Sequence, residues 1–147
     1  MKKFLVITFL LLFASLPIIA QIIHVPGDQP TIQDGIIAAV PGDVVLVAEG
    51  TYYENINFMG KAITVASHYY QDGKKKHINK TIIDGSQPSD PDFGSVVYFM
   101  SGEDTNSVLC GFTITGGTGT VQIFPGFPTM RQGGGIICLA SGANNHA

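Results

Sequence analysis

Residues 108–115, VLCGFTIT, carry the clearest strand pattern in the chain. Apolar Val108, Cys110, Phe112 and Ile114 alternate with the positions between them, and a Gly-Gly pair at 116–117 follows the run. A period of two is typical of a β-strand. Shorter β-type runs flank it and are separated by glycine or Asp-Gly breaks, at residues 44–47, 63–66, 81–83, 96–100 and 136–139. The sequence therefore favours an all-β chain of many short strands.

One segment predicts a helix instead. Residues 31–40 place Ile32, Ile36 and Val40 on one helical face, and residues 41–42, Pro-Gly, end the pattern. Thr31 can serve as the N-cap, with Asp34 three residues later as its acidic partner. Without a second helix the βαβ crossovers of a doubly wound sheet cannot form.

Two all-β arrangements remain, an antiparallel sandwich or barrel and a β-solenoid. In a solenoid each strand pairs in parallel with its counterpart one turn later. The chain lacks two-residue Asn-Gly or Gly-Gly hairpin turns between alternating strands, which favours the solenoid.

The composition and net charge of the chain argue against several classes of protein. The 147 residues are 45% hydrophobic and 13% charged, with 18 glycines and a formal net charge of −3. A low charged share argues against a disordered tail and a coiled coil. The acidic balance disfavours nucleic-acid binding.

The first twenty residues resemble a secretory signal peptide. Lys2 and Lys3 precede an apolar run at residues 4–13, and Ala20 suits the cleavage position. The rival interpretation is an uncleaved anchor, but the run is short for a spanning helix of about 20 apolar residues. We expect a secreted or cell-surface protein with no membrane span after cleavage. Loss of both lysines leaves 6 basic residues against 11 acidic ones, a net charge of −5.

Several stretches resemble the opening of the pectin-lyase-like superfamily, whose members are right-handed parallel β-helices. The similar stretches cover most of residues 22–139 and are residues 24–28, 30–39, 42–56, 63–67, 82–85, 111–117 and 133–136. The resemblance implies a right-handed parallel β-helix over residues 21–147, with a short N-terminal α-helix capping its first coil. No closing cap follows residue 139, so we expect a partial chain, truncated at the C-terminus.

No catalytic set is visible in the sequence. The family's catalytic Asp and Arg stretches have no counterpart, Arg131 is the only arginine, and Asp84 fits a strand corner. The four histidines lack metal-ligand spacing. We therefore expect no metal and no cofactor; calcium is the one ion considered, at two short acidic pairs, Asp90 with Asp92 and Glu103 with Asp104.

Exposed aromatic rings are the candidate binding groups. The apolar loop at residues 124–128, FPGFP, offers Phe124 and Phe127, and two tyrosine pairs offer Tyr53 and Tyr70. Flat rings can stack on the apolar faces of sugars, so these four residues are candidate glycan contacts. The alternative is that the loop packs against the body of the protein.

Cys110 and Cys138 are the only cysteines of the chain. Both fall in predicted strands, and the spacing of neighbouring parallel strands is compatible with a disulfide. The alternative is two small thiols that pack as apolar groups.

The sequence favours a secreted or surface scaffold that contacts polysaccharide or another cell-surface glycan. One alternative is the non-catalytic N-terminal part of a polysaccharide lyase or pectinesterase-like enzyme. A second is a structural adhesin without glycan affinity.

Overall fold

The computed structural model describes residues 19–139. The predicted leader lies outside these residues except for its last two positions. The described part contains short strands and three helices, in the order β1 (Ile22–Val25), α1 (Ile32–Ala38), β2 (Val44–Val47), β3 (Gly50–Tyr52), β4 (Ile56–Asn57), β5 (Thr64–Ser67), α2 (Tyr69–Asp72), α3 (Lys76–Lys80), β6 (Thr81–Asp84), β7 (Phe93–Gly94), β8 (Val97–Phe99), β9 (Val108–Cys110), β10 (Thr113–Thr115), β11 (Gly119–Gln122), β12 (Met130–Gln132) and β13 (Ile136–Cys138).

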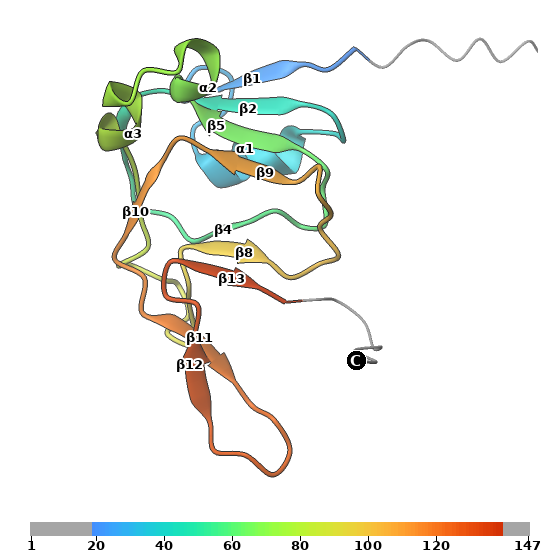
Figure 1. Ribbon diagram of the computed structural model, residues 1–147, viewed down its shortest axis with the longest axis vertical. Helices are drawn as coiled ribbons and strands as arrows, with labels where there is room; N and C mark the ends of the chain where they lie inside the picture. The colour runs from blue at the N-terminus through green and yellow to red at the C-terminus, as the bar shows by residue number, and fades with distance from the viewer. Residues whose placement is uncertain (1–18, 140–147) are drawn as a thin grey trace, which may run out of the picture.

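Three sheets contain only parallel strand pairs. Their orders are β1-β2-β5-β9, β3-β6-β10 and β4-β8-β13, so each sheet joins strands that are distant in the sequence (Figure 1). Val45 of β2 lies in register with Ile23 of β1 and Val65 of β5, and all three side chains are buried. Parallel strands in register place equivalent side chains beside one another, which builds an apolar row facing the interior.

The fourth sheet is antiparallel. Its order is β7-β11-β12, and β11 runs opposite to both of its neighbours. A turn in which Phe127 N donates to Phe124 O over 3.0 Å reverses the chain between β11 and β12. The resulting β11–β12 hairpin extends away from the rest of the structure (Figure 1).

The prediction of an all-β chain wound as one right-handed parallel β-helix is wrong. The strands form small separate sheets of both parallel and antiparallel type, and helices are added to them. The physical reason lies in two stretches. The 124–128 loop reverses the chain into a hairpin, and the polar stretch at 69–80 forms α2 and α3.

Helix α1 is held at both ends by side chains from elsewhere. Thr31 is its N-cap, as predicted, and its Oγ1 accepts a hydrogen bond of 3.0 Å from Asp34 N. The Glu54 carboxylate accepts the amides of Ile32 and Gln33, each at 2.9 Å. Lys61 Nζ lies within 2.7–2.9 Å of three carbonyl oxygens near the C-terminal end, those of Ile36, Ile37 and Ala39. These contacts satisfy terminal backbone groups that a helix cannot pair internally.

The buried core lies between α1 and the parallel sheets. Phe58 is its largest fully buried side chain, and its ring stacks on Phe99 with centroids 4.3 Å apart. Helix α1 contributes Ile32 and Ile36, both without solvent exposure. Burying such side chains contributes about 1.5–3 kcal/mol each. Packing against this core therefore stabilises a helix that is too short to be stable alone.

Candidate functional site

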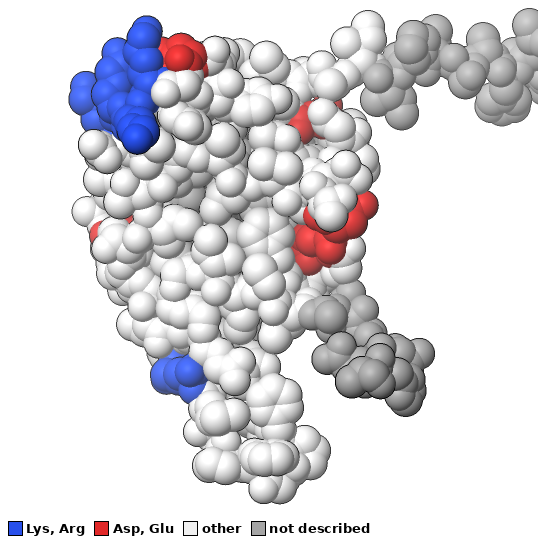
Figure 2. Space-filling model, viewed as in Figure 1, with Lys and Arg blue, Asp and Glu red and all other residues white. Residues whose placement is uncertain are grey.

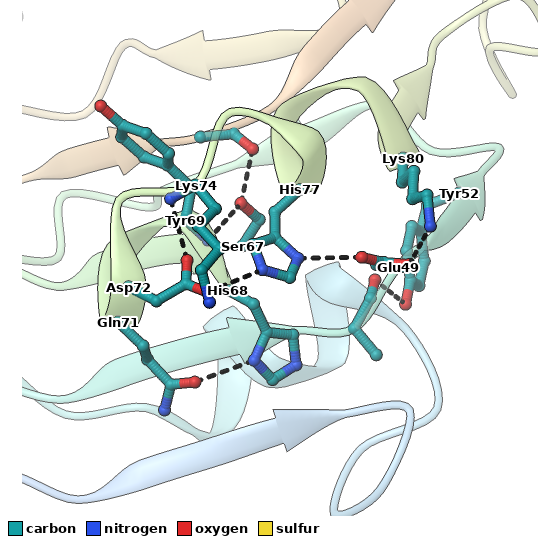
Figure 3. Close-up of polar contacts among 12 residues, drawn as sticks. Glu49, Tyr52, Ser67, His68, Tyr69, Gln71, Asp72, Lys74, His77 and Lys80 are labelled. Carbon is teal, nitrogen blue, oxygen red and sulfur yellow. Dashed lines mark hydrogen bonds and ion pairs between the residues drawn. The ribbon is translucent and has the colours of Figure 1, made fainter.

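A charged cluster joins α2 and α3 to the connection between β2 and β3. His77 lies between two carboxylates, with Nδ1 2.9 Å from Glu49 Oε1 and Nε2 3.2 Å from Asp72 Oδ2 (Figure 3). Lys80 Nζ is 3.3 Å from the second Glu49 oxygen, and Lys74 Nζ is 3.1 Å from Asp72. The lysines of this region form the basic area at the upper left of Figure 2.

Both carboxylates of the cluster favour the ionised form. Desolvation raises the pKa of Glu49, but hydrogen bonds from Lys80 and His77 outweigh it and leave the pKa below its ordinary value. The backbone amide of Lys74 lowers the pKa of Asp72 most, and contacts with the Lys74 and His77 side chains lower it further.

This cluster does not supply a hydrolytic centre. The nearby Ser67 hydroxyl is buried and donates to Gly111 O at 2.6 Å, while it accepts the amide of Tyr69. It is therefore engaged with the backbone, and within residues 19–139 it makes no hydrogen bond to a His, Asp or Glu side chain of the kind that activates a nucleophilic serine. The contacts of His77 fasten α2 and α3 to the parallel sheets, which is a structural role. Sequence reasoning missed the cluster because Glu49 and His77 are far apart in the chain.

Within residues 19–139 no group of three or more His, Cys, Asp or Glu side chains has an arrangement that could hold a metal ion. The acidic pairs considered for calcium accept hydrogen bonds from backbone amides. Asp90 accepts the amide of Asp92, and Glu103 accepts the amides of Gly60 and Ser101.

The β11–β12 hairpin presents a projecting apolar surface. Phe124 is 42% exposed and Phe127 is 69% exposed, and the turn hydrogen bond holds their backbones together. Ile123 and Met130 are exposed beside them. The tip carries no charged atoms on the face seen in Figure 2. Of the four predicted glycan contacts, the structure brings together these two phenylalanines.

Arg131 anchors the hairpin to the body of the protein. Its Nη1 donates to Pro91 O at 2.8 Å and to Gly119 O at 3.1 Å, and its Nη2 lies 3.5 Å from Asp92. The only charged side chain of residues 119–132 is therefore directed at carbonyl groups near the hairpin base.

Tyr53 and Tyr70, the other two predicted contacts, lie on other elements. Tyr70 belongs to α2, at the opposite end of Figure 1 from the hairpin tip, and Tyr53 follows β3. Both are exposed, at 54% and 59%. The structure therefore does not bring either tyrosine together with the hairpin loop as one aromatic surface.

A pocket of about 230 Å³ lies beside the base of the hairpin. Phe93 of β7 contributes to its wall, and β7 pairs directly with β11. The remaining lining residues come from β4 and β8, from the positions next to these two strands, and from the connection between β6 and β7: Asn55, Asn57, Tyr98, Met100 and Ser89. None of these side chains carries a charge at neutral pH.

The two cysteines do not form a disulfide. Cys110 lies in β9 and Cys138 in β13, which belong to different sheets, and both are free. Cys138 is exposed and Cys110 is partly exposed, so neither is fully buried as an apolar group.

Comparisons with known proteins add no assignment: no protein-family model, curated protein or solved structure matches the chain. The resemblance to the pectin-lyase-like superfamily stays a prediction. Across residues 19–139, none of the helices has the length and apolar character needed to span a bilayer.

Proposed function

We propose that this protein is an exported surface scaffold that contacts carbohydrate through the loop of the β11–β12 hairpin. The observation that supports this most is the pair of exposed rings, Phe124 and Phe127, on an element that projects from the body. Exposed contiguous apolar side chains are typical of interaction sites in soluble proteins. The signal-like leader at residues 1–20 supports export.

The chemistry of the loop favours a sugar ligand. An aromatic ring offers a flat apolar surface that packs on the C–H face of a pyranose. Pro125 and Pro128 flank the rings and restrict the backbone, which lowers the entropy lost when a ligand binds. The hairpin is also fixed at its base by Arg131, so the rings are carried by an anchored element.

Affinity electrophoresis through gels containing soluble polysaccharides tests this proposal. The full chain is run in gels with pectin, xylan or β-glucan, beside the double variant Phe124→Ala/Phe127→Ala. We expect at least one polysaccharide to retard the wild type, and the double variant to lose about tenfold in affinity, or about 1.4 kcal/mol. The matched control is Tyr53→Ala/Tyr70→Ala, which removes two equally exposed rings elsewhere.

The outcomes separate the alternatives. Equal retardation of the wild type and the phenylalanine variant would contradict the assignment to the hairpin. An absence of retardation in every gel would favour the alternative of a structural adhesin without glycan affinity. Release of unsaturated or de-esterified products from pectin by the same chain would favour the enzyme.

A further inference from the structure

We infer that the pocket beside the hairpin base binds one neutral sugar residue. The inference rests on the proposed carbohydrate function and names the ligand class of a second contact. The pocket, about 230 Å³, is smaller than the cavities of about 300–1,000 Å³ that hold drug-sized ligands, which suits a single sugar ring.

The pocket offers one hydrogen-bond acceptor and one donor that the protein does not use. Asn55 Nδ2 donates to Ser95 O at 2.8 Å and to Gly85 O at 3.3 Å, and no hydrogen bond within residues 19–139 uses Asn55 Oδ1. Asn57 Oδ1 accepts the amide of Met59 at 2.7 Å, and no hydrogen bond within the described residues uses Asn57 Nδ2. Sugar hydroxyls both donate and accept, so a neighbouring pair of hydroxyls matches this combination.

The two amides are held in fixed orientations before any ligand binds. Asn55 donates both hydrogens of its Nδ2 to backbone carbonyls, and Asn57 accepts one backbone amide at its Oδ1, so the opposite end of each side chain is left for a ligand. The backbone of Asn57 is also held by Gln33, whose Oε1 accepts the Asn57 amide at 2.7 Å and whose Nε2 donates to Asn57 O at 3.2 Å. Preorganised polar groups lose little entropy on binding.

Phe93 supplies the apolar wall. Its side chain is 51% exposed although it lies on β7, whose partner residue Thr120 is fully buried. An exposed ring beside two amides provides the combination of an apolar face and directed hydrogen bonds that a pyranose requires.

The uncharged lining favours a neutral sugar over an acidic one. A uronate carboxylate in this pocket would lose hydration without gaining a cationic partner, since no Lys or Arg lines the pocket. Arg131, the one cation of the β7-β11-β12 sheet, donates hydrogen bonds to carbonyl oxygens.

Saturation-transfer NMR on the full chain tests the inference. The probes are glucose, galactose, mannose and xylose, with glucuronate and galacturonate as their acidic counterparts. We expect at least one neutral sugar to bind and its affinity to exceed that of the matching uronate. Asn57→Asp keeps the acceptor for Met59 N and replaces the free donor with a carboxylate oxygen, so we expect it to lower the affinity about tenfold or more. Phe93→Ala should weaken binding as well.

Two controls make the result decisive. Thermal melts verify that Asn57→Asp and Phe93→Ala remain folded, and Ser86→Ala is a change on the neighbouring loop outside the pocket lining. Failure of every neutral sugar to bind, equal binding of the uronates, or an unchanged affinity in Asn57→Asp would overturn the inference. Phe124→Ala/Phe127→Ala should retain monosaccharide binding, because neither ring lines the pocket. A variant that loses only polysaccharide retardation therefore tests the hairpin, and a variant that loses only monosaccharide binding tests the pocket.

Discussion

Two fully buried threonines have opposite hydrogen-bonding situations. Thr81 begins β6, and its Oγ1 is the one buried side-chain oxygen or nitrogen of residues 19–139 without a partner. Thr120 on β11 is equally buried, but its Oγ1 lies 2.7 Å from Ser95 Oγ and 3.3 Å from the Tyr98 hydroxyl. A buried polar group without a partner costs stability, whereas a paired one does not.

Replacing each threonine with valine should therefore shift stability in opposite directions. Thr81→Val removes an unpaired hydroxyl and should raise the free energy of unfolding by about 1 kcal/mol. Thr120→Val leaves Ser95 and Tyr98 with a lost partner and should lower it by about 1–3 kcal/mol. Urea unfolding followed by circular dichroism measures both changes. A loss of stability in Thr81→Val would show that its hydroxyl is satisfied in solution.

Sequence reasoning at the scale of single residues was accurate where the signal was local. Thr31 and Asp34 lie three residues apart, and both partners of the helix cap could be read from that spacing. The exposure of Phe124, Phe127, Tyr53 and Tyr70 also agrees with the expectation of outward rings. Glu54 and Lys61 could not be assigned to the ends of α1, because their contacts depend on how β4 and β5 return to the helix.

At the scale of elements, α1 lies so close to β2 that Gly35 is required between them. A Cβ at position 35 would lie 2.7 Å from Val45 Cγ1. Val45 is fully buried, and its β-branched side chain has little freedom to move away. Helix propensity alone would favour alanine over glycine by about 1 kcal/mol.

We expect packing to outweigh propensity in Gly35→Ala. Forcing a methyl group into this contact should lower the free energy of unfolding by about 1–3 kcal/mol, because either α1 or β2 must move. Chemical denaturation of the variant and the wild type measures the difference. A more stable variant would mean that α1 packs less tightly than the structure shows.

The α2–α3 segment should respond to acid through Glu49 and Asp72. Folding lowers the pKa of both carboxyls below their ordinary values of 4.5 and 3.8, so the unfolded chain binds protons first as the pH falls. Their contribution to stability is complete above the ordinary values and decreases as the pH falls toward the folded-state pKa values. In Glu49→Gln/Asp72→Asn we expect a shallower decline of unfolding free energy below about pH 4.5. Equal slopes in variant and wild type would contradict the ionic role of the cluster.

The predicted strand at 108–115 shows why element boundaries escaped the sequence. The structure divides it into β9 and β10, because Gly111 adopts a positive φ of 82° that turns the chain. Leu109 and Ile114 both pack against the core. The inward-facing side chain is therefore at an odd-numbered position before Gly111 and at an even-numbered position after it. The alternating pattern is real on each side, but a continuous strand does not follow from it.

At the scale of the whole molecule, short strands were predictable and their pairing was not. Apolar runs such as residues 44–47 and 81–83 do form strands, as predicted, because β-branched composition and nearby glycines are local signals. Which strands pair, and in which direction, depends on contacts between distant segments. The antiparallel sheet arises because the 124–128 loop folds into a turn, a property that the apolar composition of the loop did not reveal.

One part of the candidate site could be predicted from the sequence and the other could not. The aromatic loop could be identified from FPGFP alone, whereas the pocket required Asn55, Asn57 and Phe93 to be brought together from β4, β7 and their connections. Asn55 and Asn57 became candidate ligand contacts only once the structure showed which of their side-chain atoms are bonded to the backbone.

Amide chemical-shift mapping tests the central claim most directly. The ¹⁵N-labelled full chain is titrated with the polysaccharide that retards it most, and shift changes are assigned along the sequence. We predict changes concentrated at residues 119–132 and at the pocket beside the hairpin base, with α2 and α3 unaffected. Changes confined to residues 69–80, or none at saturating polysaccharide, would contradict carbohydrate contact through the hairpin.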